Sequence, residues 1–257
     1  MKPSATGRIL LWRGGSLWIG LAGEPAGLHS HHAVQLTLPC PGDRVRFLDD
    51  AGRWVDYTAA LVVADHPHTF EARGQRVAQI FVDPESRDGR LLQRRHRGEG
   101  VVALSTESLA KRIADLAAAY ESQASETALV ELARVTIATL LGADPVPAGA
   151  PGPRVPRALG LIRERLGDKV SLEDVAAAVH LSPDRFRHLF VQETGVGLRP
   201  YLLWLRLELA LVAYVAGRSL TEAPYLGGFA GAAPFPRPLQ GVLGGPPAGG
   251  RPEEPPR

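Results

Sequence analysis

The sequence predicts an α+β protein of two domains, and three observations support this fold class. Short apolar runs separated by Gly, Pro and Asp fill the N-terminal part, which is typical of a sandwich or small barrel. The apolar period then becomes helical, and a stretch rich in Pro, Gly and Ala leads into a helical C-terminal half. We expect a β-domain over 1–104, a helical coupling or dimerisation segment over 105–142, a linker over 143–156, an all-α domain over 157–245 and a disordered tail over 246–257.

The strands of the β-domain are predicted from apolar runs that end at turn residues such as Gly14-Gly15 and His66-Pro67. We interpret residues 8 to 104 as β throughout, because no long helical period interrupts the runs. The runs are RILLW, SLWIGLAG, AVQLTL, RVRFLD, ALVVAD and RVAQIFVD.

Two antiparallel helices are predicted over 105–142, joined near Ser122 to Ser125. Each has an apolar stripe, which either packs on the β-domain or pairs with a second subunit. The stripes consist of Leu109, Ile113, Leu116 and Tyr120, and of Leu129, Leu132, Val135 and Leu140.

The stretch from Ser171 to Gly195 predicts a helix, a tight turn and a second helix. The first helix begins after Ser171, whose hydroxyl caps it, with Asp174 placed to reach back. The second begins after Ser182, with Pro183 at its first position, where the missing N–H is not needed. Its outward residues are Asp184, Arg185, Arg187 and His188, and its inward ones are Phe186, Leu189 and Phe190. A short helix that presents cations and is braced by a preceding helix favours insertion into the major groove of DNA.

Further motifs follow in order, and with this unit they resemble the AraC/XylS family of bacterial transcription regulators. The resemblance covers about Leu159 to Phe229. The matching pieces are the ETG at 193–195, Tyr201, Arg206-Leu207, Ala210, Gly217, Ser219-Leu220-Thr221 and Gly228-Phe229.

The resemblance implies a DNA-binding regulator with two helix-turn-helix units, an N-terminal sensor domain, a homodimer and RNA polymerase as a partner. It implies base-edge contacts by Asp184, Arg187 and His188, with Arg187 reading guanine. Arg185 and Arg199 are expected at phosphates, and Arg237 corresponds to an exposed arginine of the second recognition helix.

The second helix-turn-helix, expected from Leu220 to Leu243, departs from the family pattern. Pro224 falls within its first helix, and Pro234, Pro236 and Pro238 fall within its recognition helix. An interior proline costs about 3 kcal/mol or more, so we expect this helix to be absent or fragmentary. Three explanations stay open: errors or decay in this segment, DNA binding through one unit per subunit of a dimer, or loss of DNA binding.

Histidines gather at two places in the β-domain. His29 and His31 share a face if they lie on a strand, and Gln35 follows His31 by four residues. This resembles the first cupin motif with glutamine in place of glutamate, and His68 resembles the histidine of the second motif. The resemblance implies a cupin-like barrel and a metal site formed by His29, His31 and His68, suited to Zn, Fe, Mn or Ni.

Other interpretations of the histidines are that His29, His31, His32 and His68 bind an organic effector, or that they line a polar pocket. A metal-dependent cupin enzyme, or a ligand-binding protein without DNA activity, is the alternative to a regulator. The missing carboxylate and the lack of a nearby acid–base residue favour the regulator, so we expect no enzymatic activity.

The composition limits the ways in which the protein could bind DNA and the compartment in which we expect it. The net charge of the 257-residue chain is only +2, so any DNA affinity must come from a local patch. The single cysteine, Cys40, excludes an intrachain disulfide and fits a reducing compartment. No signal peptide or membrane-spanning run is evident, and we expect a cytoplasmic protein.

Overall fold

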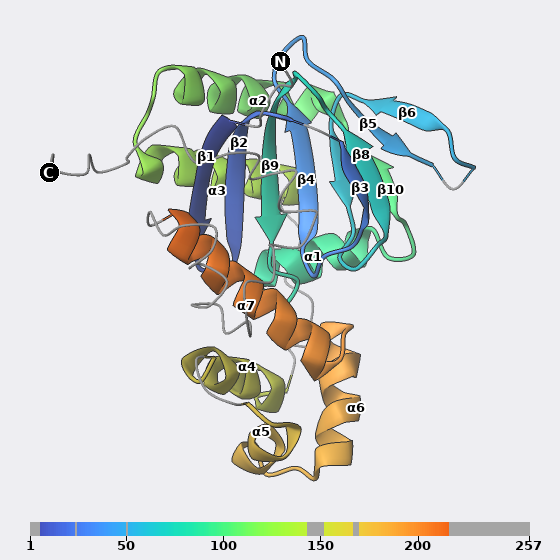
Figure 1. Ribbon diagram of the computed structural model, residues 1–257, viewed down its shortest axis with the longest axis vertical. Coiled ribbons are helices and arrows are strands. Elements are labelled where there is room, and N and C mark those ends of the chain that lie inside the picture. The colour runs from blue at the N-terminus through green and yellow to red at the C-terminus, as the bar shows by residue number, and fades with distance from the viewer. Residues whose placement is uncertain (1–5, 24, 50, 143–151, 167–169, 216–257) are drawn as a thin grey trace, which may run out of the picture. The chain divides into compact units, whose positions relative to one another are not determined.

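The computed structural model describes residues 6–23, 25–49, 51–142, 152–166 and 170–215. The described part of the chain forms two compact units, one holding the residues up to 142 and the other those from 152 onward. Strands β1–β10 and helices α1–α3 belong to the first unit, and helices α4–α7 to the second (Figure 1). The predictions about the second helix-turn-helix, Arg237 and the tail lie outside the described residues.

The first unit is built on two antiparallel sheets, as the turn-separated apolar runs predict. One has the strand order β1-β2-β9-β4-β7-β10 and the other β3-β8-β5-β6. The strands are β1 (Thr6–Trp12), β2 (Gly15–Leu21), β3 (Ala26–His29), β4 (Val34–Pro39), β5 (Val45–Leu48), β6 (Trp54–Tyr57), β7 (Ala60–Val62), β8 (His68–Glu71), β9 (Arg76–Val82) and β10 (Val101–Ala103).

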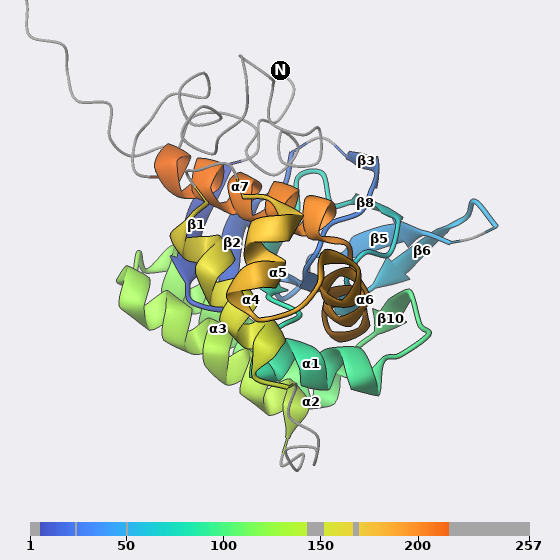
Figure 2. The same ribbon diagram turned by 90° about the horizontal axis from the view of Figure 1, so that it is seen from below.

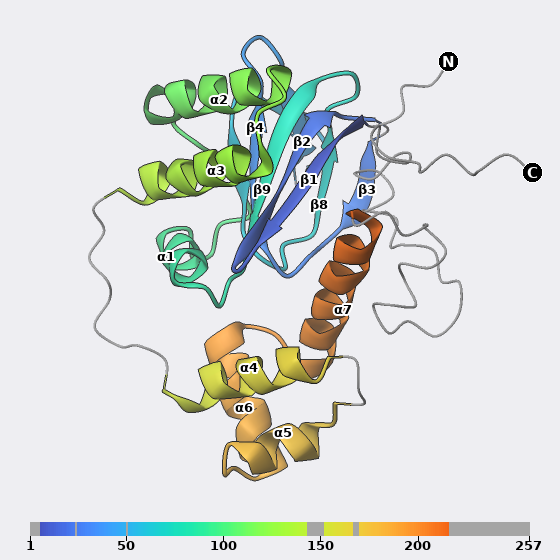
Figure 3. The ribbon, with the colours of Figure 1, turned by 90° about the vertical axis from the view of Figure 1, so that its left-hand side faces the viewer.

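The two faces of the six-stranded sheet carry different residues, because side chains alternate along a strand. On β4 and β9, aliphatic residues such as Leu36 and Ile80 belong to the core that the helices cover (Figure 3). Residues of the other face, such as Trp18, pack with Phe47 and Phe70 of the four-stranded sheet. Two apolar layers therefore enclose the sheet.

Helices α2 (Thr106–Glu121) and α3 (Glu126–Leu141) form the predicted antiparallel pair on this sheet. The stripe predicted on α2 is right, since Leu109, Ile113 and Leu116 are buried and Tyr120 packs partly against them. The stripe predicted on α3 is right in part, since Leu129 is buried and Leu132 and Leu140 pack partly against the same core. Its buried apolar line has a spacing of four residues, because this spacing keeps one side of the helix toward the sheet. That line is Leu129, Ala133, Ile137 and Leu141, whereas Leu132, Val135 and Leu140 are only partly buried.

Helix α1 (Arg87–Arg95) corrects the expectation of an all-β stretch up to residue 104. Its signals are local: Ser86 Oγ accepts from Gly89 N–H at 3.0 Å, and an acidic residue lies in its first turn. Arg95, in its last turn, donates to the carbonyls of Leu140 and Leu141 at the end of α3, the latter at 2.8 Å. The helix was missed because it is short and strongly polar.

The second unit consists of α4 (Arg154–Glu164), α5 (Leu172–Ala178), α6 (Pro183–Thr194) and α7 (Leu198–Val215). Helices α5 and α6 pack on α4, and α6 also contacts α7 (Figure 2). Phe186, Phe190 and Tyr201 are fully buried. The ring centroid of Phe190 lies 5.4 Å from that of Phe186 and 5.5 Å from that of Tyr201. No described helix combines the length and the apolar character needed to cross a membrane.

Gly89→Ala is expected to destabilise the first unit. A Cβ at this position would lie 2.0 Å from the backbone carbonyl oxygen of Asp83, so α1 or the Asp83 turn must shift. Overpacking of this kind costs about 1–3 kcal/mol. Gly160→Ala on α4 is the control, because its Cβ would meet no atom within 4 Å and alanine favours a helix by about 1 kcal/mol. Thermal denaturation followed by circular dichroism measures both, and an unchanged midpoint for Gly89→Ala would contradict the close contact.

Candidate ligand site and DNA-binding surface

A row of polar side chains lies in the layer between the two sheets. Gln35 and Thr37 on β4 and Gln79 on β9 are each at most 2% exposed. Thr37 and Gln79 are direct cross-strand neighbours, so their side chains lie on the same face. Both amide atoms of Gln79 lack a hydrogen-bond partner among the described residues. Buried polar groups are seldom left unpaired in proteins, so Gln79 offers a donor and an acceptor to a ligand that enters this layer.

Three of the four predicted histidines converge at one end of this row. His29 and His68 are paired across β3 and β8, and His31 lies in the turn that follows β3. The ring centroids of His29 and His68 are 4.2 Å apart, and those of His31 and His68 are 5.1 Å apart. One ligand nitrogen from each ring lies within 4.8 Å of the others.

Hydrogen bonds to the backbone determine which nitrogens keep a lone pair. His29 Nδ1 donates to the carbonyl of Gly27 at 2.7 Å, and His68 Nδ1 donates to that of His66 at 2.9 Å. A neutral imidazole that donates through Nδ1 keeps an acceptor lone pair on Nε2. The Nε2 atom of His68 is buried and has no hydrogen-bond partner among the described residues.

The three rings are neutral at physiological pH. Burial lowers the pKa of His31 to about 4, although the hydrogen bond that its ring donates to the side-chain oxygen of Gln35 acts to raise it. Burial, together with the proximity of His31 and His29, lowers the pKa of His68 to about 3, and burial also lowers that of His29. Neutral imidazoles are the form that binds metals or accepts hydrogen bonds from a ligand.

Gln35 links the histidines to the polar row. Its side-chain oxygen lies 2.7 Å from His31 Nε2, and its amide nitrogen donates to Thr37 Oγ1 at 2.8 Å. The glutamine therefore stands beside His31 at the position of the carboxylate expected from the cupin motif. Three imidazoles and an amide oxygen form a donor set that fits a borderline transition metal, with one negative charge less than a carboxylate would supply.

His32 is not part of this cluster. Its ring is 4% exposed, with Nδ1 donating to Asp65 at 3.0 Å and Nε2 donating to Glu85 at 2.7 Å. Burial alone lowers the pKa of His32, but the hydrogen bonds and charges of both carboxylates outweigh it and raise the pKa to about 9. His32 is thus an imidazolium held between two acids.

Glu85 completes this clamp. Burial raises the pKa of its carboxyl and the imidazole of His32 lowers it, while Asp83 adds to the rise, giving about 7. Asp65 and Glu85 both face His32 and together stabilise its positive charge in a buried place. Asp65, Glu85 and Gln79 were not singled out from the sequence, although Gln79 is a lone polar residue within the apolar run RVAQIFV.

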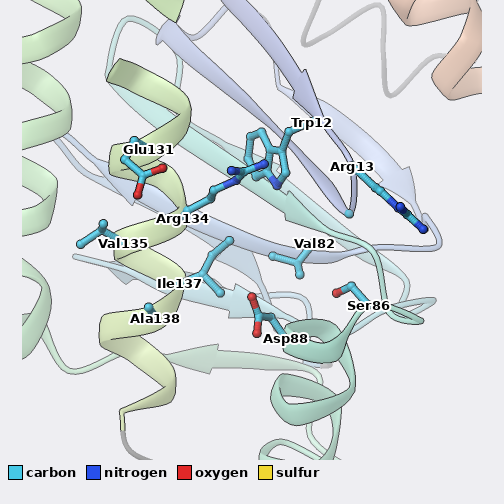
Figure 4. A pocket seen from close by; sticks show the side chains of 11 residues that line it. Trp12, Arg13, Val82, Ser86, Asp88, Glu131, Arg134, Val135, Ile137 and Ala138 are labelled. Carbon is cyan, nitrogen blue, oxygen red and sulfur yellow. The ribbon is translucent and has the colours of Figure 1, made fainter. Parts of the chain in front are cut away.

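A separate pocket of about 370 Å³ lies outside the inter-sheet layer (Figure 4). It is bounded by the turn between β1 and β2, by the start of α1 and by α3. Its lining combines apolar side chains with charged side chains of both signs. The lining includes Trp12, Val82, Ser86, Asp88, Arg134 and Ile137.

The helix-turn-helix forms as the capping pattern predicts. The hydroxyls of Ser171 and Ser182 accept from the N–H groups of Asp174 and Arg185. His180 takes a left-handed conformation in the turn (φ 57°), and α6 ends at the left-handed Gly195 (φ 83°). The two helices are therefore defined by local signals at each end.

The outward side of α6 carries the residues expected at DNA. Asp184, Arg185, Arg187 and His188 are exposed, and so is Arg199 on α7. Arg187 donates to the Asp184 carboxylate three residues earlier, which orients the guanidinium along the helix surface. Arg237 lies outside the described residues.

The comparisons with known proteins bear on the fold. No protein-family model matches the sequence, and no curated protein matches it. ToxT of Vibrio cholerae O395 matches at 10% identity and a TM-score of 0.50, covering 88% of this chain and 92% of ToxT. An apo, substituted form from strain SCE256 matches at 8% identity and 0.55, covering 94% and 97%.

A third ToxT structure, from strain SCE256 with an unsaturated fatty acid bound, matches at 10% identity and a TM-score of 0.51, covering 94% of each chain. At these identities the matches show the fold alone. The chain has the fold of ToxT over about 90% of its length, with a β-sheet region followed by a helical region.

The clamp predicts loss of stability at alkaline pH. The folded-state pKa of His32, about 9, is above its ordinary 6.5, so its contribution is complete below 6.5 and is lost as pH rises through 9. The pKa of Glu85 is raised from 4.5 to about 7, so its own contribution is lost as pH rises through 7 and adds nothing to the fall above that pH. Urea unfolding measured from pH 6.5 to 10 should show a falling free energy of unfolding in the wild type and a smaller fall in His32→Gln. Equal slopes would exclude the clamp.

Proposed function

We propose that this chain is a sequence-specific DNA-binding transcription regulator whose N-terminal unit senses a ligand. The observation that carries the proposal is α6, whose aromatic side is fully buried while its opposite side presents two arginines and a histidine to solvent. A recognition helix needs this combination, because the buried side fixes its orientation and the exposed side enters the major groove.

In this proposal the exposed residues of the second unit form two groups, one that contacts base edges and one that contacts phosphates. Arg187 reads a guanine edge through two parallel N–H donors, exchanging its present acceptor on Asp184 for the base. Asp184 and His188 lie at neighbouring base edges. Arg185 and Arg199 contact phosphates, which supply affinity and its salt dependence.

The ligand is proposed to bind among His29, His31 and His68, beside Gln79. A neutral acceptor nitrogen on His68 and two unpartnered amide atoms on Gln79 offer both acceptors and a donor in a buried layer. Leaving such groups unpaired is costly, so a ligand that pairs them gains free energy. The fatty acid bound by ToxT is largely apolar, whereas these groups favour a polar ligand.

A divalent transition metal is the second candidate for the same site. The clustering of three neutral imidazoles with the side-chain oxygen of Gln35 favours it. His32 does not contact a ligand in this scheme but positions His31 through the clamp. A metal-dependent cupin enzyme stays the alternative function, to be recognised by metal binding without specific DNA binding.

The regulator is proposed to be a cytoplasmic homodimer that acts on RNA polymerase. With one recognition helix described per chain, two copies would place two helices on successive half-sites. Sedimentation velocity of the full chain distinguishes monomer from dimer, and a monomer at micromolar concentration would exclude this arrangement.

Arg187→Ala is expected to weaken binding to a specific site by about 1–3 kcal/mol and to relax preference at one base pair. Fluorescence anisotropy with DNA upstream of the protein's own gene, beside random DNA, measures this at several salt concentrations. Arg185→Ala is the matched control. It should weaken both DNAs alike and lower the salt slope by about one. Equal losses on both DNAs for Arg187→Ala would contradict its base-reading role.

Metal binding is tested with the chelator-treated full chain and Co²⁺ or Zn²⁺. One equivalent is expected to bind and to be lost in His68→Ala, because this ring supplies a neutral buried nitrogen. His96→Ala is the control, since its ring bonds to Glu99 outside the cluster. If His68→Ala binds the metal as the wild type does, the metal candidate fails for this site. The site then binds an organic ligand or has no binding function.

A further inference from the structure

The histidine site is connected to another part of the first unit by adjacent residues. His31 and His32 follow each other in the turn between β3 and β4, yet one ring joins the histidine cluster and the other joins the clamp. Asp65, a clamp residue, also donates its backbone N–H to the carbonyl of His31 at 2.9 Å. The shared backbone and this hydrogen bond therefore link a displacement of the His31 backbone to the clamp.

The clamp in turn holds the start of α1. Glu85, which accepts from His32, immediately precedes Ser86, the residue that caps α1. The carbonyl of Glu85 also accepts from the side chain of Arg90 within the helix. The place that a Cβ on Gly89 would occupy lies 2.0 Å from the carbonyl of Asp83, so the helix rests directly on the segment that carries Glu85. Helix α1 therefore moves with the clamp.

The other end of α1 holds the end of α3. Arg95 donates to the carbonyls of Leu140 and Leu141, which are among the last four of α3 and have no partner within that helix. Helix α3 ends at Leu141, and Gly142 is the last described residue before the second unit begins. A single arginine thus caps the helix that leads toward the DNA-binding unit.

We infer that α1 is a coupling element: occupancy of the histidine site acts through the His32 clamp and Arg95 on the last turn of α3. This inference rests on the proposed function and names how its ligand is sensed. A ligand that draws His31 toward His68 displaces His32 and Glu85, and the nine-residue α1 carries that displacement to Arg95. Occupancy of the histidine site thereby changes how firmly Arg95 holds the last turn of α3.

Two features make α1 suited to this role. The buried ring of His32 is hydrogen-bonded through both nitrogens, to Asp65 at 3.0 Å and to Glu85 at 2.7 Å, and breaking either bond would leave a buried polar atom unpaired, so the contact follows a movement rather than breaking. The pocket of about 370 Å³ lies between the first turn of α1 and α3, near Asp88 and Ala138, and leaves room for the helix to shift (Figure 4). Arg95, at the far end, is the point of attachment.

The test is hydrogen exchange of the full chain, measured by mass spectrometry on peptides covering 136–142, with peptides of α2 as an internal reference. His32→Gln perturbs the clamp, at one end of the route, and Arg95→Ala perturbs the contact with α3, at the other end. His32→Gln is made alone and together with Arg95→Ala. His32→Gln alone should speed exchange at 139–142 several-fold without changing α2. Combined with Arg95→Ala it should add nothing, because the link is already cut.

Arg94→Ala is the matched control, since this neighbour is exposed and makes no hydrogen bond or ion pair with another described residue. His32→Gln must keep its effect in the Arg94→Ala background. Glu85→Gln replaces His32→Gln if the latter does not fold, because it weakens the same contact while keeping the shape of the side chain. If His32→Gln and Arg95→Ala change the exchange rate at 139–142 independently and additively, the inference is overturned.

Zn²⁺ serves as the probe of occupancy in a second arm. Slower exchange at 139–142 on adding Zn²⁺, abolished by Arg95→Ala with Zn²⁺ affinity unchanged, supports the coupling. Bound Zn²⁺ with the same exchange in wild type and Arg95→Ala overturns it. If neither Zn²⁺ nor specific DNA binds, the proposed function fails, while the non-additivity of the variants still decides the coupling.

Discussion

The two-residue alternation of β4 and β9 is the constraint on which the first unit depends. It sends Leu36 and Ile80 to the layer under α2 and α3, and Gln35 and Gln79 to the layer between the sheets. A shift of register by one residue would exchange the layers, placing amides under the helices. The same alternation therefore fixes both where the helices pack and where a ligand meets polar groups.

Burial gives the polar groups of the inter-sheet layer their chemistry. The rings of His31 and His68 are kept neutral because they are buried beside one another, whereas His32, equally buried, is kept charged by two carboxylates. Neighbouring histidines in the sequence thus have opposite protonation states. One set of rings offers lone pairs to a ligand, and the other ties together three loops and the start of α1.

The second unit depends on local signals to a greater degree. Serine caps at two helix starts and a left-handed glycine at one helix end mark the bounds of α5 and α6 in the local sequence. Packing of Phe186, Phe190 and Tyr201 then fixes which side of α6 is exposed. Local definition and one buried aromatic cluster suffice to present Arg187 to solvent, which is the property that the proposed function requires.

The periodicity and the caps of the sequence determined the strands, the helical pair and the helix-turn-helix, because these are short-range properties, whereas the convergence of His29, His31 and His68 was expected only from the resemblance to the cupin motifs. It did not reveal α1, which is too short and polar to give a periodic signal. The separation of His32 from its neighbours, its pairing with Asp65 and Glu85, and the partnerless amide of Gln79 were decided by tertiary structure. Contacts across 33 and 53 residues of chain depend on how loops from different strands meet, and no local pattern encodes that meeting.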